Sequence, residues 1–216
     1  MSISITLIII IITCLVSITA FTNSKIHDDL IFYPPAITYD KQYYRFFTCG
    51  LIHANYMHLG FNMYSFWIFG QAVEHQFYGA FGEKGRWLYL LMYVTALFFC
   101  LIPTYIKNKT NQNYLSLGAS GAVSAVIFAF IFLDPIRDLG LIILPRNWAI
   151  PGFIFGALYL IISSYMDKRG GGNINHSAHI WGALYGISFL IVTGSFLSDH
   201  NLLMEFISKI RYHFHL

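Results

Sequence analysis

The sequence predicts an all-α membrane protein, folded as a single domain of six membrane-spanning helices over residues 1–216. Of its 216 residues, 56% are hydrophobic and only 11% are charged, whereas a soluble domain is about one quarter charged. Six apolar stretches are long enough to cross a hydrocarbon core of ~30 Å, which takes about 20 helical residues. They are residues 3–22, 56–74, 87–106, 115–133, 148–166 and 178–197.

The first apolar stretch has two interpretations, a signal peptide ending at Ala20 or a retained helix. No Lys or Arg precedes the stretch, and its apolar run is longer than the core of a usual signal peptide. Both features favour a membrane-spanning helix that is kept.

The connection 23–55 between the first two stretches is rich in aromatic residues. Tyr and Phe side chains lie near Lys41 and Arg45, after the pair Pro34 and Pro35. Aromatic rings beside basic residues favour the headgroup zone of a membrane. We therefore expect this segment to lie in the interface; the alternative is a loose loop outside the membrane.

Turn residues separate the remaining stretches. Gly79 to Arg86 interrupts the chain after the second stretch, Asp134-Pro135 ends the fourth, and three glycines at 170–172 precede the sixth. A tail from about 198 to 216 follows the sixth. Lys and Arg are divided almost evenly between the two sides, so charge does not set an orientation.

Charge and cysteine content exclude other classes of protein. The 13 Lys and Arg against 10 Asp and Glu leave a net charge of +3, which is too small to indicate nucleic-acid binding. Cys14, Cys49 and Cys100 have no evident partners, so we expect packing residues rather than a disulfide framework.

Polar residues stand in the second, fourth and sixth apolar stretches. His58 and Asn62 begin the second, Ser120 begins the fourth, and His179 begins the sixth. Even-numbered spans run in one direction in a simple up-and-down bundle, so these residues would share one side and one depth. Ionisable residues within membranes indicate a functional site.

Small residues would let the helices of Ser120 and His179 approach closely. His179 lies three residues before one glycine of the sixth stretch and seven before another, so all three share a helical face. If the helix of Ser120 packs there, the two side chains come within hydrogen-bond distance. The glycines concerned are Gly118, Gly121, Gly182 and Gly186.

A serine and a histidine in contact can perform acyl transfer. Serine needs a base to take its proton, and histidine titrates near neutrality. Donors for an oxyanion would be His58 and Asn62, which are spaced i, i+4 on one face, and the N–H groups at the helix start of Ser120. No acidic residue stands where it could orient His179, so a dyad is predicted rather than a triad.

Three motifs resemble those of the rhomboid family of intramembrane serine proteases, in its compact six-helix bacterial form. The similarity extends from about Tyr44 to Gly186. The motifs are His53-x4-His58-Leu-x2-Asn62-Met63, Gly118-x-Ser120-Gly121 and Ala178-His179-x2-Gly182-x3-Gly186.

The resemblance implies that Ser120 is the nucleophile, that His179 is the general base, and that His58, Asn62 and the Ser120 backbone N–H form the oxyanion hole. It implies a water-filled cavity over the dyad, a cytoplasmic N-terminus and no metal or other cofactor. The expected substrates are membrane proteins whose transmembrane helices unwind near small residues. With no transit peptide or large soluble domain in the sequence, a bacterial plasma membrane is expected.

Two positions depart from the family pattern. Ser124 stands where the family usually has an aromatic residue that packs on the catalytic histidine, and Tyr44-Arg45 stands where bacterial members often have Trp-Arg. We expect spare room beside Ser124, unless another ring such as Trp181 fills it.

Other functions are less consistent with the sequence. His53, His58, His176 and His179 could be metal ligands, but HExxH is absent and no carboxylate lies in the middle of a span. An aspartyl protease would need aspartates within spans. The remaining alternative is a catalytically silent rhomboid-like protein that binds or chaperones membrane proteins.

Overall fold

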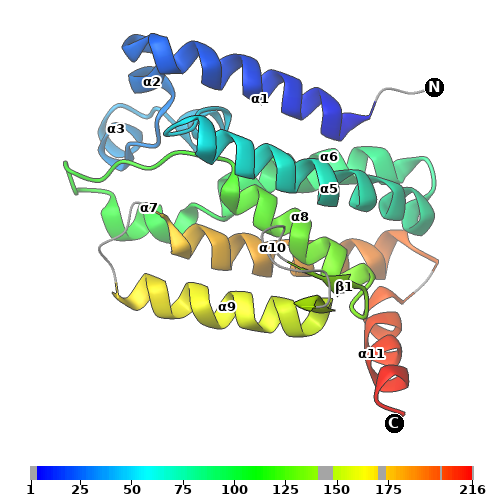
Figure 1. Ribbon diagram of the computed structural model, residues 1–216. Coiled ribbons are helices and arrows are strands. Elements are labelled where there is room, and N and C mark those ends of the chain that lie inside the picture. The colour runs from blue at the N-terminus through cyan, green and yellow to red at the C-terminus, as the bar shows by residue number, and fades with distance from the viewer. Residues whose placement is uncertain (1–3, 141–147, 170–173, 200, 216) are drawn as a thin grey trace.

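The protein is an all-α membrane protein, and the computed structural model describes residues 4–140, 148–169, 174–199 and 201–215. Its long helices lie side by side, and short helices gather at one end of them (Figure 1). The helices are α1 (Ile5–Thr22), α2 (Ser24–Leu30), α3 (Pro34–Tyr39), α4 (Arg45–Thr48), the 3-10 helix η1 (Cys49–Leu51), α5 (Tyr56–Phe81), α6 (Lys84–Phe99), α7 (Ile102–Asn108), α8 (Ser120–Leu133), α9 (Gly152–Arg169), α10 (His176–Leu197) and α11 (Leu202–His213). The short strands β1 (Asp138–Leu139) and β2 (Ile150–Pro151) pair antiparallel.

Three helical segments of the described residues are long and apolar enough to cross a membrane. They are Ile5–Thr22, Lys84–Asn108 and His176–Leu197; the second includes both α6 and α7. Ser120–Leu133 is a shorter apolar helix. Each of the six predicted stretches contains a helix, while the number of spans stays a prediction.

The second long helix, α5, runs to Phe81 instead of ending at residue 74. The Glu74 carboxylate accepts hydrogen bonds from the Ser4 hydroxyl at 2.7 Å and the Ile5 backbone N–H at 2.8 Å. A helix N-terminus favours a nearby negative charge, so α1 stabilises this carboxylate within α5. The helix ends at Gly82, whose φ of +59° suits glycine.

Two other predicted stretches differ in detail from the observed helices. Stretch 87–106 is two helices, α6 and α7, that are separated at Cys100 and Leu101; Pro103, in the first turn of α7, has no N–H to continue the helix. Stretch 115–133 becomes helical only at Ser120, because Phe32 and Ser116 exchange backbone hydrogen bonds of 3.0 and 3.1 Å. The helices predicted at 148–166 and 178–197 differ from α9 and α10 by a few residues at their ends.

The connection 23–55 is ordered rather than loose. The side chain of Arg45 is 7% exposed, and its guanidinium donates hydrogen bonds to the carbonyls of Asp28 at 2.8 Å and Ile31 at 2.7 Å. These bonds tie α4 to the end of α2. The tail also has a helix, α11, in which Lys209 donates a 2.7 Å hydrogen bond to the Leu133 carbonyl at the end of α8.

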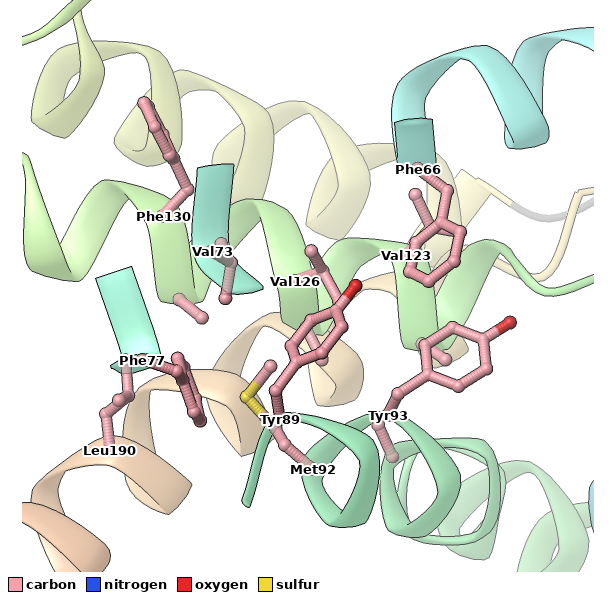
Figure 2. Packing of buried hydrophobic residues seen from close by; sticks show 14 of the residues in the cluster. Phe66, Val73, Phe77, Tyr89, Met92, Tyr93, Val123, Val126, Phe130 and Leu190 are labelled. Carbon is pink, nitrogen blue, oxygen red and sulfur yellow. The ribbon is translucent and has the colours of Figure 1, made fainter. Parts of the chain in front are cut away.

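Helix α8 lies at the centre of the core. It contacts α5, α6, α9 and α10, and nearly all of its residues from Gly121 to Phe132 are buried. Figure 2 shows labelled side chains of α5, α6, α8 and α10 gathered in one cluster of the core. The residue that begins α8 is therefore held by the best-packed part of the molecule.

Helices α8 and α10 touch through their backbones, as the glycine pattern predicts. A Cβ added at Gly182 would overlap the Gly121 carbonyl oxygen, and one at Gly186 would overlap the Ala125 carbonyl oxygen. Small residues therefore set the spacing between these helices. Cys14, Cys49 and Cys100 are free, and Cys49 and Cys100 are buried.

Candidate active site

Ser120 is the first residue of α8, directly after a sharp turn. Gly118 has a φ of +109°, which residues with a Cβ rarely adopt. Its N–H donates a 2.9 Å hydrogen bond to the Cys49 carbonyl, which fixes the turn against η1. The serine thus stands at the N-terminus of a buried helix, where the helix dipole favours negative charge.

His179 reaches Ser120 from the first turn of α10. Its Nε2 lies 2.7 Å from the Ser120 Oγ, so the two side chains are hydrogen bonded. Asn175 caps α10, because its Oδ1 accepts from the Ala178 N–H at 3.0 Å and from the Thr104 hydroxyl at 3.2 Å. The nucleophile and base of the sequence prediction are therefore in direct contact.

The glycines around the dyad permit this contact. Besides Gly182 and Gly186, Gly121 leaves room for its neighbours: a Cβ there would lie 2.5 Å from the Cys100 Sγ and 3.2 Å from the Ala178 carbonyl oxygen. A Cβ at Gly118 would lie 2.8 Å from the His58 ring. All four predicted packing glycines thus lie at close approaches beside the dyad or along the α8–α10 contact.

His58 lies against the turn that precedes Ser120. The Ala54 N–H donates to its Nδ1 at 3.4 Å, which leaves Nε2 as the protonated nitrogen of the neutral ring. This Nε2 lies 3.1 Å from where a Cβ of Gly118 would be. His58 therefore presents an N–H donor beside the start of α8.

Asn62 is buried one helical turn after His58. Its side chain is 7% exposed, and its Nδ2 donates to the His58 carbonyl at 3.0 Å. An amide nitrogen carries two protons, so one remains for another acceptor. Asn62 supplies at most one donor to a reacting group.

His53 has a supporting position that the sequence did not assign. The Ser17 hydroxyl donates to the Leu51 carbonyl at 2.7 Å and also contacts the His53 Nδ1 at 2.9 Å. Because the serine proton is used, the His53 Nδ1 is the donor and its Nε2 an acceptor, with no partner in the described structure. Burial, and secondly the nearby charge of His58, lower the pKa of His53 to about 3.

The expectation of spare room beside Ser124 was wrong. Ser124 is 2% exposed, and Tyr159 of α9 lies next to it, with 2.7 Å between the two hydroxyl oxygens. The Tyr159 ring is stacked on His179, with ring centroids 6.3 Å apart and an interplanar angle of 29°. Trp181 does not fill this position, because it is 47% exposed.

Tyr159 is the site residue that sequence reasoning missed. It lies in an apolar stretch without a recognisable motif, and its contact with the dyad depends on how α9 packs against α8. The departure at Ser124 was the available signal, since it indicated a ring missing from α8 that another helix could provide.

The four histidines considered as metal ligands form two pairs of rings. The centroids of His53 and His58 are 5.0 Å apart, and those of His176 and His179 are 5.7 Å apart. Within the described residues, no group of three or more His, Cys, Asp or Glu is placed to hold an ion. A surface pocket of about 430 Å³ borders His53 but not the dyad; its lining is Ala20, Phe21, Thr22, Ser24, His27, His53 and Ala54.

Two comparisons with known proteins found matches to this chain. A family model described as the Rhomboid domain matches residues 40–196. The chain is 29% identical over 167 residues to the rhomboid protease GlpG from Haemophilus influenzae, which covers 74% of this chain and 76% of that protein. It is 27% identical over 139 residues to the presenilin-associated rhomboid-like protein A, mitochondrial, from Danio rerio, covering 64% of this chain and 34% of that protein.

Proposed function

The chain belongs to the rhomboid family, and we propose that it is an intramembrane serine endopeptidase that works through a Ser120–His179 dyad. The 2.7 Å contact between the Ser120 Oγ and the His179 Nε2 is the observation that carries the proposal. A serine in contact with a base is the minimum needed for nucleophilic catalysis.

In the proposed reaction, the Ser120 Oγ attacks the carbonyl carbon of the scissile peptide while the His179 Nε2 takes the hydroxyl proton. The C–N bond then breaks as His179 returns that proton to the leaving amine. Water hydrolyses the acyl-enzyme in the second half of the reaction, with His179 again as base. No cofactor is required.

Three groups are suited by their hydrogen-bond chemistry to stabilise the oxyanion. They are the Ser120 N–H at the start of α8, the protonated Nε2 of His58, and the free amide proton of Asn62. Donors that are fixed before the reaction stabilise the developing charge without reorganisation. We propose these three as the oxyanion hole.

The substrates we propose are transmembrane segments of other membrane proteins. The relative from Haemophilus influenzae is a rhomboid protease, and the dyad of this chain lies at the ends of two apolar helices, α8 and α10. A bundle of six spanning helices within one domain, residues 1–216, and a bacterial plasma membrane complete the proposal.

Cleavage of a model transmembrane substrate in proteoliposomes tests the function. Ser120→Ala and His179→Ala should each abolish cleavage while the melting temperature stays near wild type, because a nucleophile and its base act as a unit. Ser208→Ala, an exposed serine of α11, is the matched control. Substrate binding without cleavage by the wild type would instead favour a catalytically silent rhomboid-like protein.

A further inference from the structure

Tyr159 of α9 stacks directly on His179 and is linked to Ser120 through Ser124. Its ring stacks on His179 at a centroid distance of 6.3 Å, within the range of about 4.5–7 Å that offset aromatic pairs prefer. Its hydroxyl lies 2.7 Å from the Ser124 Oγ, and Ser124 donates to the Ser120 carbonyl at 2.8 Å. One side chain of α9 is therefore linked to both reacting residues.

The direction of these hydrogen bonds is determined. A serine hydroxyl has one proton, and that of Ser124 is given to the Ser120 carbonyl, which can only accept. The Tyr159 O–H must therefore donate to the Ser124 Oγ. This bond fixes the hydroxyl, at the far end of the tyrosine side chain, against the helix of the nucleophile.

The packing of α9 brings the ring to this position. Gly152, Gly156 and Ser163 are buried on the same face of α9 as Tyr159, since positions spaced by three or four residues share a face. A Cβ at Gly156 would lie 3.3 Å from the Phe128 ring, whose centroid is 5.5 Å from that of Tyr159. Small residues thus let α9 approach α8 closely enough for Tyr159 to reach His179.

We propose that Tyr159 and Ser124 form a positioning pair that holds the His179 ring with its Nε2 directed at Ser120. This inference rests on the proposed function and assigns α9 a part in the reaction. A displacement of about 1 Å in a reacting group can cost on the order of 10²-fold in rate. A ring fixed on one side by stacking has less freedom to turn away from the serine.

The first test is the kinetics of Tyr159→Leu, Tyr159→Phe and the control Tyr165→Leu. Tyr165 lies on the same helix and is 63% exposed. Tyr159→Leu should lower kcat roughly 10- to 100-fold with KM within about 2-fold of wild type, by analogy with the cost of a displaced reacting group. Tyr159→Phe, which keeps the ring but not the hydroxyl, should lose less, roughly 2- to 10-fold, and Tyr165→Leu should match the wild type. A Tyr159→Leu enzyme with wild-type kcat, or with a loss confined to KM, would overturn the proposal.

The second test is a double-mutant cycle that keeps the ring, so it remains decisive if Tyr159→Leu does not fold. Tyr159→Phe and Ser124→Ala each remove one partner of the same hydrogen bond. Each should lower kcat by roughly 2- to 10-fold, the range of a typical hydrogen bond, and the double variant should lose no more than the worse single variant. Losses that multiply, or no loss in either single variant, would contradict the pairing.

Labelling of Ser120 by a fluorophosphonate probe separates this inference from the proposed function. The probe reacts with an activated serine and needs no transmembrane substrate. Its rate should fall in Tyr159→Leu as kcat falls, and labelling should be absent in Ser120→Ala. Labelling of Ser120→Ala equal to that of the wild type would contradict the proposed dyad. A wild-type labelling rate in Tyr159→Leu would contradict only the proposed role of Tyr159.

Discussion

At the scale of single residues, the site combines one strong contact with several weaker supports. The Ser120–His179 hydrogen bond of 2.7 Å is short, whereas Asn62 uses one of its amide protons within α5. An oxyanion donor that shares its task with two other donors should cost less when it is removed than the nucleophile or its base. The loss of kcat in each variant therefore shows how much that residue contributes to the candidate site.

Asn62→Ala should lower kcat by roughly 10²-fold or less, a smaller loss than at Ser120. One oxyanion donor is worth about 10²–10³ in kcat, and His58 and a backbone N–H would remain. Asn108→Ala is the matched control, because Asn108 is also buried and also donates to the carbonyl four residues before it. Single-turnover rates of both variants check this. An unchanged rate with a lower melting temperature would make Asn62 a packing residue.

His53 should make the folded protein less stable in acid. Its pKa is lowered to about 3 by burial and by His58, against about 6.5 in an unfolded chain. Below pH ~6.5 the unfolded chain binds a proton that the folded protein does not, so stability falls as the pH drops toward 3. The loss of melting temperature between pH 7.5 and 4.5 in detergent should be smaller in His53→Gln. An equal loss in both proteins would show that His53 is not the titrating group.

At the scale of elements, the apolar stretches predicted where the long helices lie, and the glycine spacing on α10 predicted its contact with α8. Helix ends were harder to predict, because they depend on contacts made elsewhere in the chain. Glu74 remains inside α5 because the N-terminus of α1 meets it, and residues 115–119 are not helical because Phe32 pairs with Ser116. Apolar content along the sequence does not contain this information.

The residues of the candidate site also differ in how well the sequence predicted them. The candidate roles of Ser120, His179, His58 and Asn62 followed from motifs that are each short and continuous in the sequence. Tyr159 did not, because its contact with His179 requires the packing of α9 against α8. The missing ring at Ser124 indicated that support was needed, without indicating which helix provides it.

Gly186→Ala should separate α8 from α10 and reduce both stability and cleavage. A Cβ there overlaps the Ala125 carbonyl oxygen, which is backbone and cannot turn aside, and overpacking typically costs about 1–3 kcal/mol. Gly79→Ala on α5, where a Cβ meets nothing within 4 Å, is the control. Melting temperature and cleavage rate, measured below the melting temperature of both variants, check the expectation. If both substitutions behave alike, the close backbone contact does not hold the dyad together.

At the scale of the whole molecule, the long helices bring three N-termini to one end. Figure 1 shows α5, α8 and α10 beginning toward the end where α2 and α3 lie, while α11 lies at the opposite end of the long helices. His58, Ser120 and His179 are each in the first turn of one of these helices. The three residues are therefore brought to one end of the bundle because their helices run in the same direction.

A dyad of serine and histidine needs no metal ion, so chelators should not inhibit the enzyme. EDTA and phenanthroline should leave the initial rate of substrate cleavage in proteoliposomes within about 2-fold of the untreated rate. Zinc content of the purified protein, measured by mass spectrometry, is the accompanying control. Stoichiometric zinc together with loss of activity on chelation would assign the histidines to an ion instead.

The most direct test of the dyad is covalent labelling of the purified wild-type protein by a fluorophosphonate, with the modified residue located by peptide mass spectrometry. A serine whose proton is taken by a histidine is the group that such a probe modifies. We predict stoichiometric modification of Ser120 in the wild type and in Ser208→Ala, and none in His179→Ala. A wild-type protein that remains unlabelled, or one labelled equally after His179→Ala, would contradict a Ser120–His179 protease.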